Sequence, residues 1–147
     1  MNDRWNYRCM TIDDYEQSVA LWQAADGVSL RSADSRAGIE KYLLRNPGLS
    51  FVAEQQGHII GTIMAGHDGK RGYVQHLTVA TSHRRQGIAT ALVQQCLAAL
   101  TQQGITKSHL NILADNEDAR AFWTALGWYQ RTDIHMYSFI NGVDPNA

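Results

Sequence analysis

The chain has 147 residues, of which 44% are hydrophobic, 18% are charged and two are proline, so we expect one compact domain and exclude global disorder. Its net charge of −1 argues against a general nucleic-acid binder. The two cysteines, Cys9 and Cys96, form no CxxC pattern, and the sequence begins without an apolar signal core and has no apolar run of roughly 18 residues. We therefore expect no zinc site, no disulfide framework, no membrane association and a reducing cytoplasmic location.

Charge is distributed unevenly along the chain. Residues 69–114 carry five basic and no acidic side chains, whereas residues 1–68 and 115–147 each carry a net charge of −3. A cationic middle between acidic flanks favours a small polyanionic ligand over an extended nucleic-acid backbone. Because scattered solvated bases would give the same count, a motif must decide between the two interpretations.

The first third of the chain predicts a short strand at residues 7–10 followed by two helices. Thr11 and the acids after it are typical of a helix start, and apolar residues then recur at spacings of three and four up to Gly27: Ile12, Tyr15, Val19 and Trp22. A second helix is predicted from Ser35 to Arg45, where Asn46-Pro47-Gly48 ends it.

The pattern then changes to strands, which alternate with two more helices. Strands are predicted at residues 49–54, 58–66, 73–79, 107–113, 129–132 and 135–140, with a hairpin turn at Gln55-Gln56-Gly57. Helices are predicted at 87–103, on the apolar stripe Ile88, Leu92, Cys96 and Leu100, and at 116–126. This order predicts a single α+β domain over residues 7–140, between short tails, with a mixed sheet of about seven strands and four helices.

The most informative stretch is the strand at 73–79, its short loop, and Arg84-Arg85-Gln86-Gly87-Ile88-Ala89 at the start of the next helix. A helix N-terminus offers free N–H groups to an anion, and Gly87 and Ala89 let a phosphate approach the backbone. The pattern R-x-x-G-x-A is weak alone, because small residues also open helices for packing, but the strand–loop–helix context strengthens it. The chain contains neither G-x-G-x-x-G nor G-x-x-x-x-G-K-[ST], so dehydrogenase and NTPase interpretations are set aside.

The sequence resembles the GNAT superfamily of acetyl-CoA-dependent N-acetyltransferases. Arg84-x-x-Gly87-x-Ala89 is similar to its acyl-CoA pyrophosphate loop. Asn116-x-x-Ala119-x-x-Phe122-Trp123-x-x-Leu126-Gly127-Trp128 is similar to its second signature. Two motifs in the right order are far more specific than one, and the likeness extends from about Tyr7 to Phe139. The resemblance implies the GNAT fold, in which the strand ending at Val79 splays from its neighbour at 107–113.

The resemblance also implies a site for acetyl-CoA. Backbone N–H groups from Gln86 to Thr90, including those of Gly87, Ile88 and Ala89, would hold the pyrophosphate beside Arg84 and Arg85. Main-chain groups of Leu77 and Val79 would pair with pantetheine, and one N–H would polarise the thioester carbonyl. Further contacts would come from the second signature: Asn116, Ala119, Phe122 and Trp123. Asn116 is also explained as the N-cap of its helix, and the two roles can coexist.

Trp123 departs from the family pattern, which commonly has a tyrosine there that protonates the departing thiolate. An indole N–H donates a hydrogen bond but does not act as an acid near neutral pH. Thiolate is a tolerable leaving group, with a thiol pKa of roughly 8.5, so the reaction need not fail. Tyr129 or Tyr137 could substitute, although each is more often a packing residue.

Acetyl transfer to an amine needs a base that removes a proton from the nitrogen. His76 lies on the strand that carries the polarising amides, and an unperturbed histidine pKa of roughly 6.5 suits this role; a half-buried structural histidine is an equal alternative. Glu54 is the second candidate. His83 is predicted to neighbour a phosphate or the adenine, and the remaining histidines have no metal-ligand spacing, so no metal is expected.

The substrate-binding loop of the family lies between the first two helices, here residues 25–34. Asp26 or Asp34 could attract an amine and Arg31 a carboxylate or phosphate, or each could be a solvated charge. The leading hypothesis is an N-acetyltransferase that acts on a primary amine by direct transfer in a ternary complex. The alternative is a catalytically weak acyl-CoA sensor or partner module. Because related folds often dimerise through their C-terminal strands, a homodimer stays open.

Overall fold

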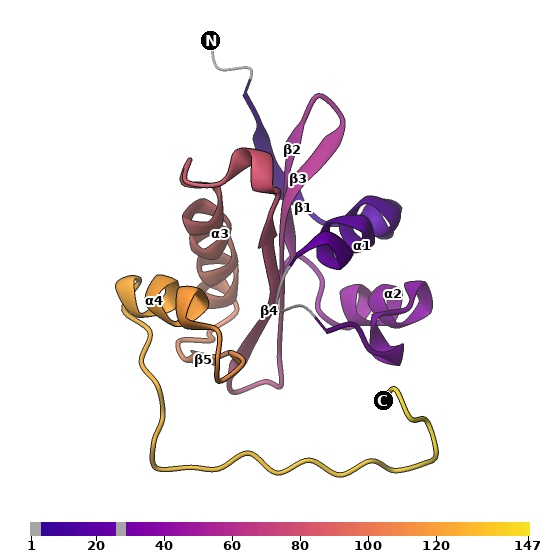
Figure 1. Cartoon of the computed structure of the whole chain (residues 1–147), viewed down its shortest axis with the longest axis vertical. Coiled ribbons are helices and arrows are strands. Elements are labelled where there is room, and N and C mark those ends of the chain that lie inside the picture. Colours follow the sequence, from indigo (N-terminus) through magenta and orange to yellow (C-terminus); the bar gives the residue numbers. More distant parts are fainter. Residues whose placement is uncertain (1–3, 26–28) are drawn as a thin grey trace.

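The computed structural model describes residues 4–25 and 29–147, and it places a five-stranded sheet between two layers of helices (Figure 1). The strands are β1 (Asn6–Cys9), β2 (Phe51–Gln55), β3 (His58–His67), β4 (Gly72–Val79) and β5 (Ser108–His109). Helices α1 (Tyr15–Ala24) and α2 (Arg36–Arg45) cover one face, and α3 (Ile88–Gln102) and α4 (Glu117–Ala125) cover the other. Three 3₁₀ helices complete the fold: η1 (Ile12–Asp14), η2 (Ser32–Asp34) and η3 (Thr81–His83). The α+β class and the four helices are confirmed.

The sheet is mixed, with the strand order β1-β2-β3-β4-β5. Its first four strands are antiparallel, and β5 runs parallel to β4. The predicted hairpin between β2 and β3 is confirmed: Gln56 and Gly57 both have positive φ, 51° and 81°, as a two-residue turn of the favoured twist requires.

Two predicted strands are wrong, so the sheet has five strands rather than seven. Residues 129–132 and 135–140 form no strand, and the strand predicted over 107–113 is confined to β5. A strand needs a neighbouring ladder of hydrogen bonds, and alternation of apolar residues does not provide one. Because β5 pairs with β4 over only two residues, its outer edge offers the C-terminal segment few backbone groups with which to form another strand.

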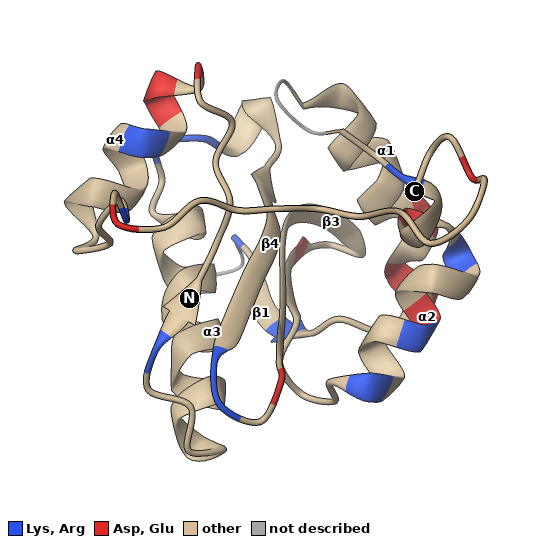
Figure 2. Ribbon diagram, turned by 90° about the horizontal axis from the view of Figure 1, so that it is seen from below, with Lys and Arg blue, Asp and Glu red and all other residues tan. Residues whose placement is uncertain are grey.

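The C-terminal segment instead crosses the molecule as an extended chain from the end of α4 toward α1 and α2 (Figure 2). The backbone N–H of Ser32 donates to the carbonyl of Asn146 over 2.9 Å, which fastens the end of the segment to η2. Its larger apolar side chains are exposed: Tyr129, Ile134, Met136, Tyr137, Phe139, Ile140 and Val143.

Strands β4 and β5 separate soon after they meet. Gly72 pairs with Ser108 and Tyr73 pairs with His109, and the pairing ends there although β4 continues to Val79. The predicted divergence of these two strands is therefore confirmed. It leaves the backbone from Val74 onward without a ladder partner from β5 on that edge.

Each face of the sheet has its own hydrophobic cluster. The α3 stripe predicted from the sequence is confirmed, since Ile88, Leu92, Cys96 and Leu100 are each at most 1% exposed. On the opposite face Trp22 of α1 is fully buried. Burial of one large apolar side chain stabilises the fold by about 1.5–3 kcal/mol, so these clusters hold α1 and α3 firmly against β3 and β4.

Candidate active site

The central feature of the site is a bulge in β4 at His76. Thr62 pairs with Thr78 and Met64 pairs with Gln75, so a single residue of β3 faces both His76 and Leu77. His76 has φ +52°, a left-handed conformation that a residue with a side chain adopts only when its surroundings impose it. Bulges of this kind redirect a side chain and interrupt the ladder, here in the middle of the strand that leads into η3.

A buried chain of hydrogen bonds holds this bulge. The indole N–H of Trp22 donates to Oγ1 of Thr62 over 2.9 Å, and that hydroxyl donates to the carbonyl of His76 over 2.7 Å. The ring of Trp22 also stacks on the ring of His76, with centroids 4.1 Å apart and planes 14° apart. Helix α1 therefore fixes both the backbone and the imidazole of His76.

Asp34 at the end of η2 completes the surroundings of His76. Its Oδ1 lies 2.8 Å from Nε2 of His76, and its Oδ2 accepts the backbone N–H of Arg31 over 2.9 Å. Both side chains are largely buried, 15% exposed for Asp34 and 11% for His76. Burial raises the pKa of Asp34, but the hydrogen bonds from His76 and Arg31 outweigh burial and lower the pKa below its ordinary value.

Glu54 lies elsewhere, in an ion-pair cluster between β1 and β2. Nε of Arg8 donates to one of its carboxylate oxygens over 3.0 Å, and Nη2 donates to the other over 3.4 Å. The same guanidinium binds Asp14 over 2.8 and 2.9 Å. Burial raises the pKa of Asp14, yet the hydrogen bonds from Arg8 and from the Thr11 N–H lower it overall. The structure thus does not bring Glu54 and His76 together.

The loop after η3 has the conformation of an anion-binding turn. Arg85 has φ +62° and Gly87, the N-cap of α3, has φ +83°. A side-chain carbon added at Gly87 would meet no atom within 4 Å, so the space beside this backbone is open. The first turn of α3 contains no acidic residue, and Arg84 and Arg85 are exposed beside it. Its free N–H groups and the positive end of the helix dipole therefore favour an anion.

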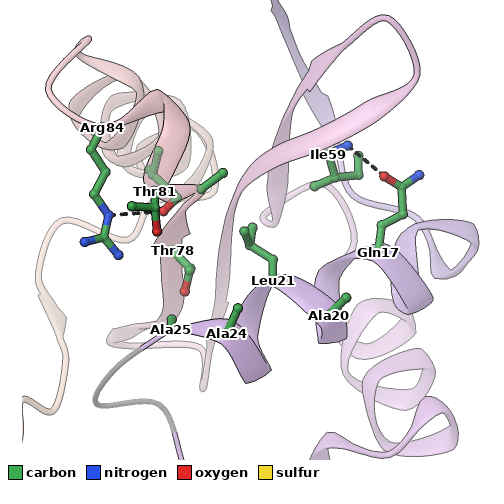
Figure 3. A pocket seen from close by; sticks show the side chains of 11 residues that line it. Gln17, Ala20, Leu21, Ala24, Ala25, Ile59, Thr78, Thr81 and Arg84 are labelled. Atoms are coloured by element: carbon green, nitrogen blue, oxygen red, sulfur yellow. Dashed lines mark hydrogen bonds between the residues drawn. The ribbon is translucent and has the colours of Figure 1, made fainter.

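A cavity of about 360 Å³ lies next to this loop, between α1 and the end of β4 (Figure 3). Small side chains of α1, Ala20 and Ala24, form one wall, and Thr78 and Arg84 belong to the opposite wall. Thr78 is 7% exposed, and among the described residues its hydroxyl has no hydrogen-bond partner. A buried polar atom without a partner at a cavity wall fits a ligand with hydrogen-bonding groups.

The second motif forms α4, which packs on the α3 face of the sheet. Asn116 is its N-cap, with its side-chain oxygen accepting the N–H of Ala119 over 3.0 Å. Trp123 is 8% exposed, and its ring lies edge-on between the rings of Phe122 and Trp128, at 5.2 and 4.9 Å. Capping therefore explains Asn116, and core packing explains Trp123.

Other predicted residues lie apart from the bulge. The ring nitrogens of His83 contact Gln55 over 2.8 Å and Ser82 over 2.7 Å, so β2 holds this histidine. Tyr129 and Tyr137 are 71% and 91% exposed in the C-terminal segment. Asp26 lies outside the described residues.

Sequence reasoning placed Asp34 in an acceptor loop and missed its contact with His76. It also missed that Trp22, predicted only as part of an apolar helix face, supports the same imidazole. A buried tryptophan usually finds a partner for its indole N–H, which is the signal that could have drawn attention to it.

A metal-binding cluster and a membrane-spanning helix are both absent from residues 4–25 and 29–147. Within these ranges no group of three or more His, Cys, Asp or Glu side chains could hold a metal ion. None of the helices described in these ranges combines the length and apolar character needed to span a bilayer.

Comparison with known proteins identifies the family of the chain. Residues 12–128 match the Acetyltransferase (GNAT) family. The chain is 34% identical over 133 residues to Acetyltransferase ECA0875 of Pectobacterium atrosepticum, covering 90% of this chain and 89% of that protein.

Solved structures share the fold at low sequence identity. Ard1 from Thermoplasma volcanium superposes with a TM-score of 0.75 at 20% identity, over 84% of this chain and 81% of Ard1. The PaiA N-acetyltransferase of Thermoplasma acidophilum, solved in complex with coenzyme A, gives a TM-score of 0.73 at 16% identity, over 86% and 89% of the two chains. From the family match and the sequence identity together, we conclude that this chain belongs to the GNAT acetyltransferase family.

Proposed function

We propose that the chain transfers an acetyl group from acetyl-CoA to a primary amine by direct transfer, with both substrates bound together. The observation that carries this proposal is the bulge of β4 at His76. The same strand leads through η3 into Arg84–Gly87, the loop that opens α3. A proton acceptor and an anion-binding turn thus lie on one short stretch of backbone.

Acetyl-CoA supplies the acetyl group as a thioester. The open space at Gly87 and the unblocked first turn of α3 suit its pyrophosphate, which N–H groups from Gln86 to Thr90 would bind beside Arg84 and Arg85. Beyond Tyr73 the β5-facing edge of β4 has no ladder partner from β5, so main-chain groups of Leu77 and the N–H of Val79 are available to pantetheine, whereas the Val79 carbonyl accepts from Nε of Arg84 over 3.5 Å. One N–H of this segment would polarise the thioester carbonyl.

His76 is the better supported base. An amine attacks only when its nitrogen has a lone pair, so a group near the thioester must accept a proton. The imidazole of His76 is held in one orientation by Trp22 and Asp34. Both carboxylate oxygens of Glu54 accept from Arg8, which leaves that group committed to an ion pair.

The cysteines support direct transfer rather than a covalent acetyl-enzyme. Cys96 is fully buried in α3, and burial raises the pKa of its thiol to about 12. A thiol is nucleophilic as the thiolate, which Cys96 does not form near neutral pH. Cys9 is the last residue of β1, a strand separated from β4 by β2 and β3.

One observation favours the alternative, an acyl-CoA sensor. Trp123 stands where the family pattern has an acidic tyrosine, and it is buried among aromatic rings. The indole cannot protonate a departing thiolate. If no other group takes this role, chemistry would be slow and binding would dominate.

Turnover with a panel of amines separates the two functions. Acetyl-CoA and CoA should be separated by chromatography, because the exposed thiol of Cys9 would react with a thiol dye. The panel should include a polyamine, an amino sugar, free lysine and peptides with a free N-terminus. Release of CoA that depends on one amine supports the transferase. Tight acetyl-CoA binding with no amine-dependent release supports the sensor.

The binding loop is tested by Gly87→Glu, with Gly104→Glu as the matched control. Both glycines have positive φ, 83° and 82°, lie at opposite ends of α3 and have open space around them, so backbone strain and added charge are comparable. Thermal stabilisation by CoA should disappear in Gly87→Glu and persist in Gly104→Glu. Unchanged CoA affinity in a folded Gly87→Glu variant would contradict the assignment of the loop.

A further inference from the structure

The two short helices η1 and η2 end in the same arrangement. Each finishes on an aspartate whose Oδ2 accepts the backbone N–H three residues earlier, Thr11 for Asp14 and Arg31 for Asp34, over 2.9 Å in both cases. The Oδ1 of each then binds a side chain from a strand. Asp14 binds the guanidinium of Arg8, and Asp34 binds the imidazole of His76.

This arrangement determines which nitrogen of His76 carries a proton. A carboxylate only accepts hydrogen bonds, so the 2.8 Å contact requires a hydrogen on Nε2. In the neutral ring the other nitrogen, Nδ1, then has the lone pair. Asp34 cannot turn away from this contact, because the backbone of Arg31 occupies its second oxygen.

We propose that Asp34 is a positioning residue that holds His76 in the tautomer with Nδ1 as the proton acceptor and stabilises the imidazolium formed there. The inference rests on the proposed function. In the reaction a nitrogen–hydrogen bond of the ammonium form of the substrate breaks, its proton goes to Nδ1, and the electron pair stays on nitrogen. That pair forms the carbon–nitrogen bond to the acetyl carbon while the carbon–sulfur bond of the thioester breaks, and the departing sulfur takes the second proton lost by the nitrogen, so CoA leaves as the thiol. The charged ring is balanced by the Asp34 carboxylate until the proton passes to water.

Within residues 4–25 and 29–147, the contacts of the His76 ring include no charged side chain besides Asp34. From α1 come the stacked ring of Trp22 and the hydroxyl of Tyr15, which donates to the carbonyl of Asp34 over 2.7 Å. From β3 comes the uncharged Thr62, and from α2 Tyr42 contacts the neighbouring Gln75. Asp34 is therefore the charged partner that would face the imidazolium.

Asp34→Asn is a sharp test because of the Arg31 N–H. That N–H needs an acceptor, so the single oxygen of asparagine is drawn to it and the NH₂ group is left facing Nε2. The hydrogen bond to His76 then requires the lone pair on Nε2, and the proton moves to Nδ1. The shape of the site is retained, while the tautomer is reversed and the negative charge is lost.

Kinetics with acetyl-CoA and the best amine of the panel test the reversal. We expect Asp34→Asn to lower kcat/KM by roughly 10-fold or more, up to the 10²–10⁴-fold loss typical of a missing base. CoA affinity should be unchanged, and the pH profile should differ from that of the wild type because the carboxylate beside the ring is gone. An unaltered rate and pH profile would overturn the proposal.

Two further variants separate positioning from a structural role. The double variant His76→Ala/Asp34→Asn should lose no more activity than His76→Ala alone, because Asp34 acts through the ring. Asp14→Asn removes a carboxylate with the same contacts on η1 and should lower stability without moving the pH profile. Additive losses in the double variant, or a profile shift in Asp14→Asn, would refute the positioning role.

A readout without catalysis keeps the test independent of the proposed function and of the folding of any variant. In the wild-type protein, ¹⁵N NMR of labelled histidine above neutral pH should find the proton of His76 on Nε2. A proton on Nδ1 would overturn the proposal even if the enzyme is active. Lack of turnover with every amine would instead reject the proposed function and leave the tautomer result to decide the role of Asp34.

Discussion

Thr62 and Thr78 form a matched pair for testing how the bulge at His76 is held. They face each other on β3 and β4 and are 0% and 7% exposed. The hydroxyl of Thr62 accepts from Trp22 and donates to the carbonyl of His76. In the described part of the chain the hydroxyl of Thr78 has no partner. Replacing either threonine by valine keeps the branched shape of the side chain and exchanges the hydroxyl for a methyl group.

The expected costs differ strongly. Thr62→Val leaves the N–H of the fully buried Trp22 and the carbonyl of His76 without a partner. Each orphaned group costs about 1–3 kcal/mol, so the free energy of unfolding should fall by about 2–6 kcal/mol. Thr78→Val removes a group that is already without a partner, and we expect a change near zero or a small gain in stability.

Urea unfolding followed by tryptophan fluorescence measures both changes. With a denaturant dependence of about 1–3 kcal/mol per molar urea, a loss of about 3 kcal/mol lowers the midpoint by about 1–3 M. Thr62→Ser, which keeps the hydroxyl and loses one methyl group, should cost only about 1 kcal/mol. Equal destabilisation by Thr62→Val and Thr78→Val would refute the reasoning that the bonded hydroxyl supports the bulge.

Three other predictions concern the base, the ion pair of Asp14 and the two cysteines. His76→Ala should reduce kcat/KM by about 10²–10⁴-fold and remove the ascending limb of the pH profile. Glu54→Gln should leave this limb in place. If instead the limb shifts in Glu54→Gln and stays intact in His76→Ala, Glu54 is the base. The ion pair with Arg8 lowers the pKa of Asp14 despite burial, so the stabilisation from this pair is present above about pH 4 and is lost as the pH falls below that value. In Asp14→Asn the free energy of unfolding should therefore decline less steeply toward acid pH. A thiol reagent should modify the exposed Cys9 and leave Cys96 unreacted until urea is added, as mass spectrometry can check.

Features that depend on residues close in sequence could be predicted. The stripe on α3 repeats every three or four residues, so a helix with that face buried follows from local geometry. The β2–β3 turn follows from Gly57 between two strand patterns, since glycine adopts positive φ without steric cost. The glycine at the start of α3 and the polar cap of α4 are local signals of the same kind.

The contacts that shape the site could not be predicted in this way. Asp34 and His76 are 42 residues apart, and only the packing of η2 beside β4 brings them together. The sequence gives no sign that β4 bulges at His76, because the bulge depends on its register with β3. The alternation over residues 129–140 predicts strands, but a strand also requires a free neighbouring edge, and that is a property of the whole sheet.

The central claim is direct transfer of acetyl from acetyl-CoA to an amine, and an isotope label tests it most directly. The protein is incubated with acetyl-CoA labelled in the acetyl group and with the amine panel, and both amines and protein are then examined by mass spectrometry. We predict that the label appears on the nitrogen of one class of primary amine, that none is found on the protein, and that His76→Ala slows its appearance. Bound acetyl-CoA with no labelled amine, or label on a cysteine of the protein, would contradict the account.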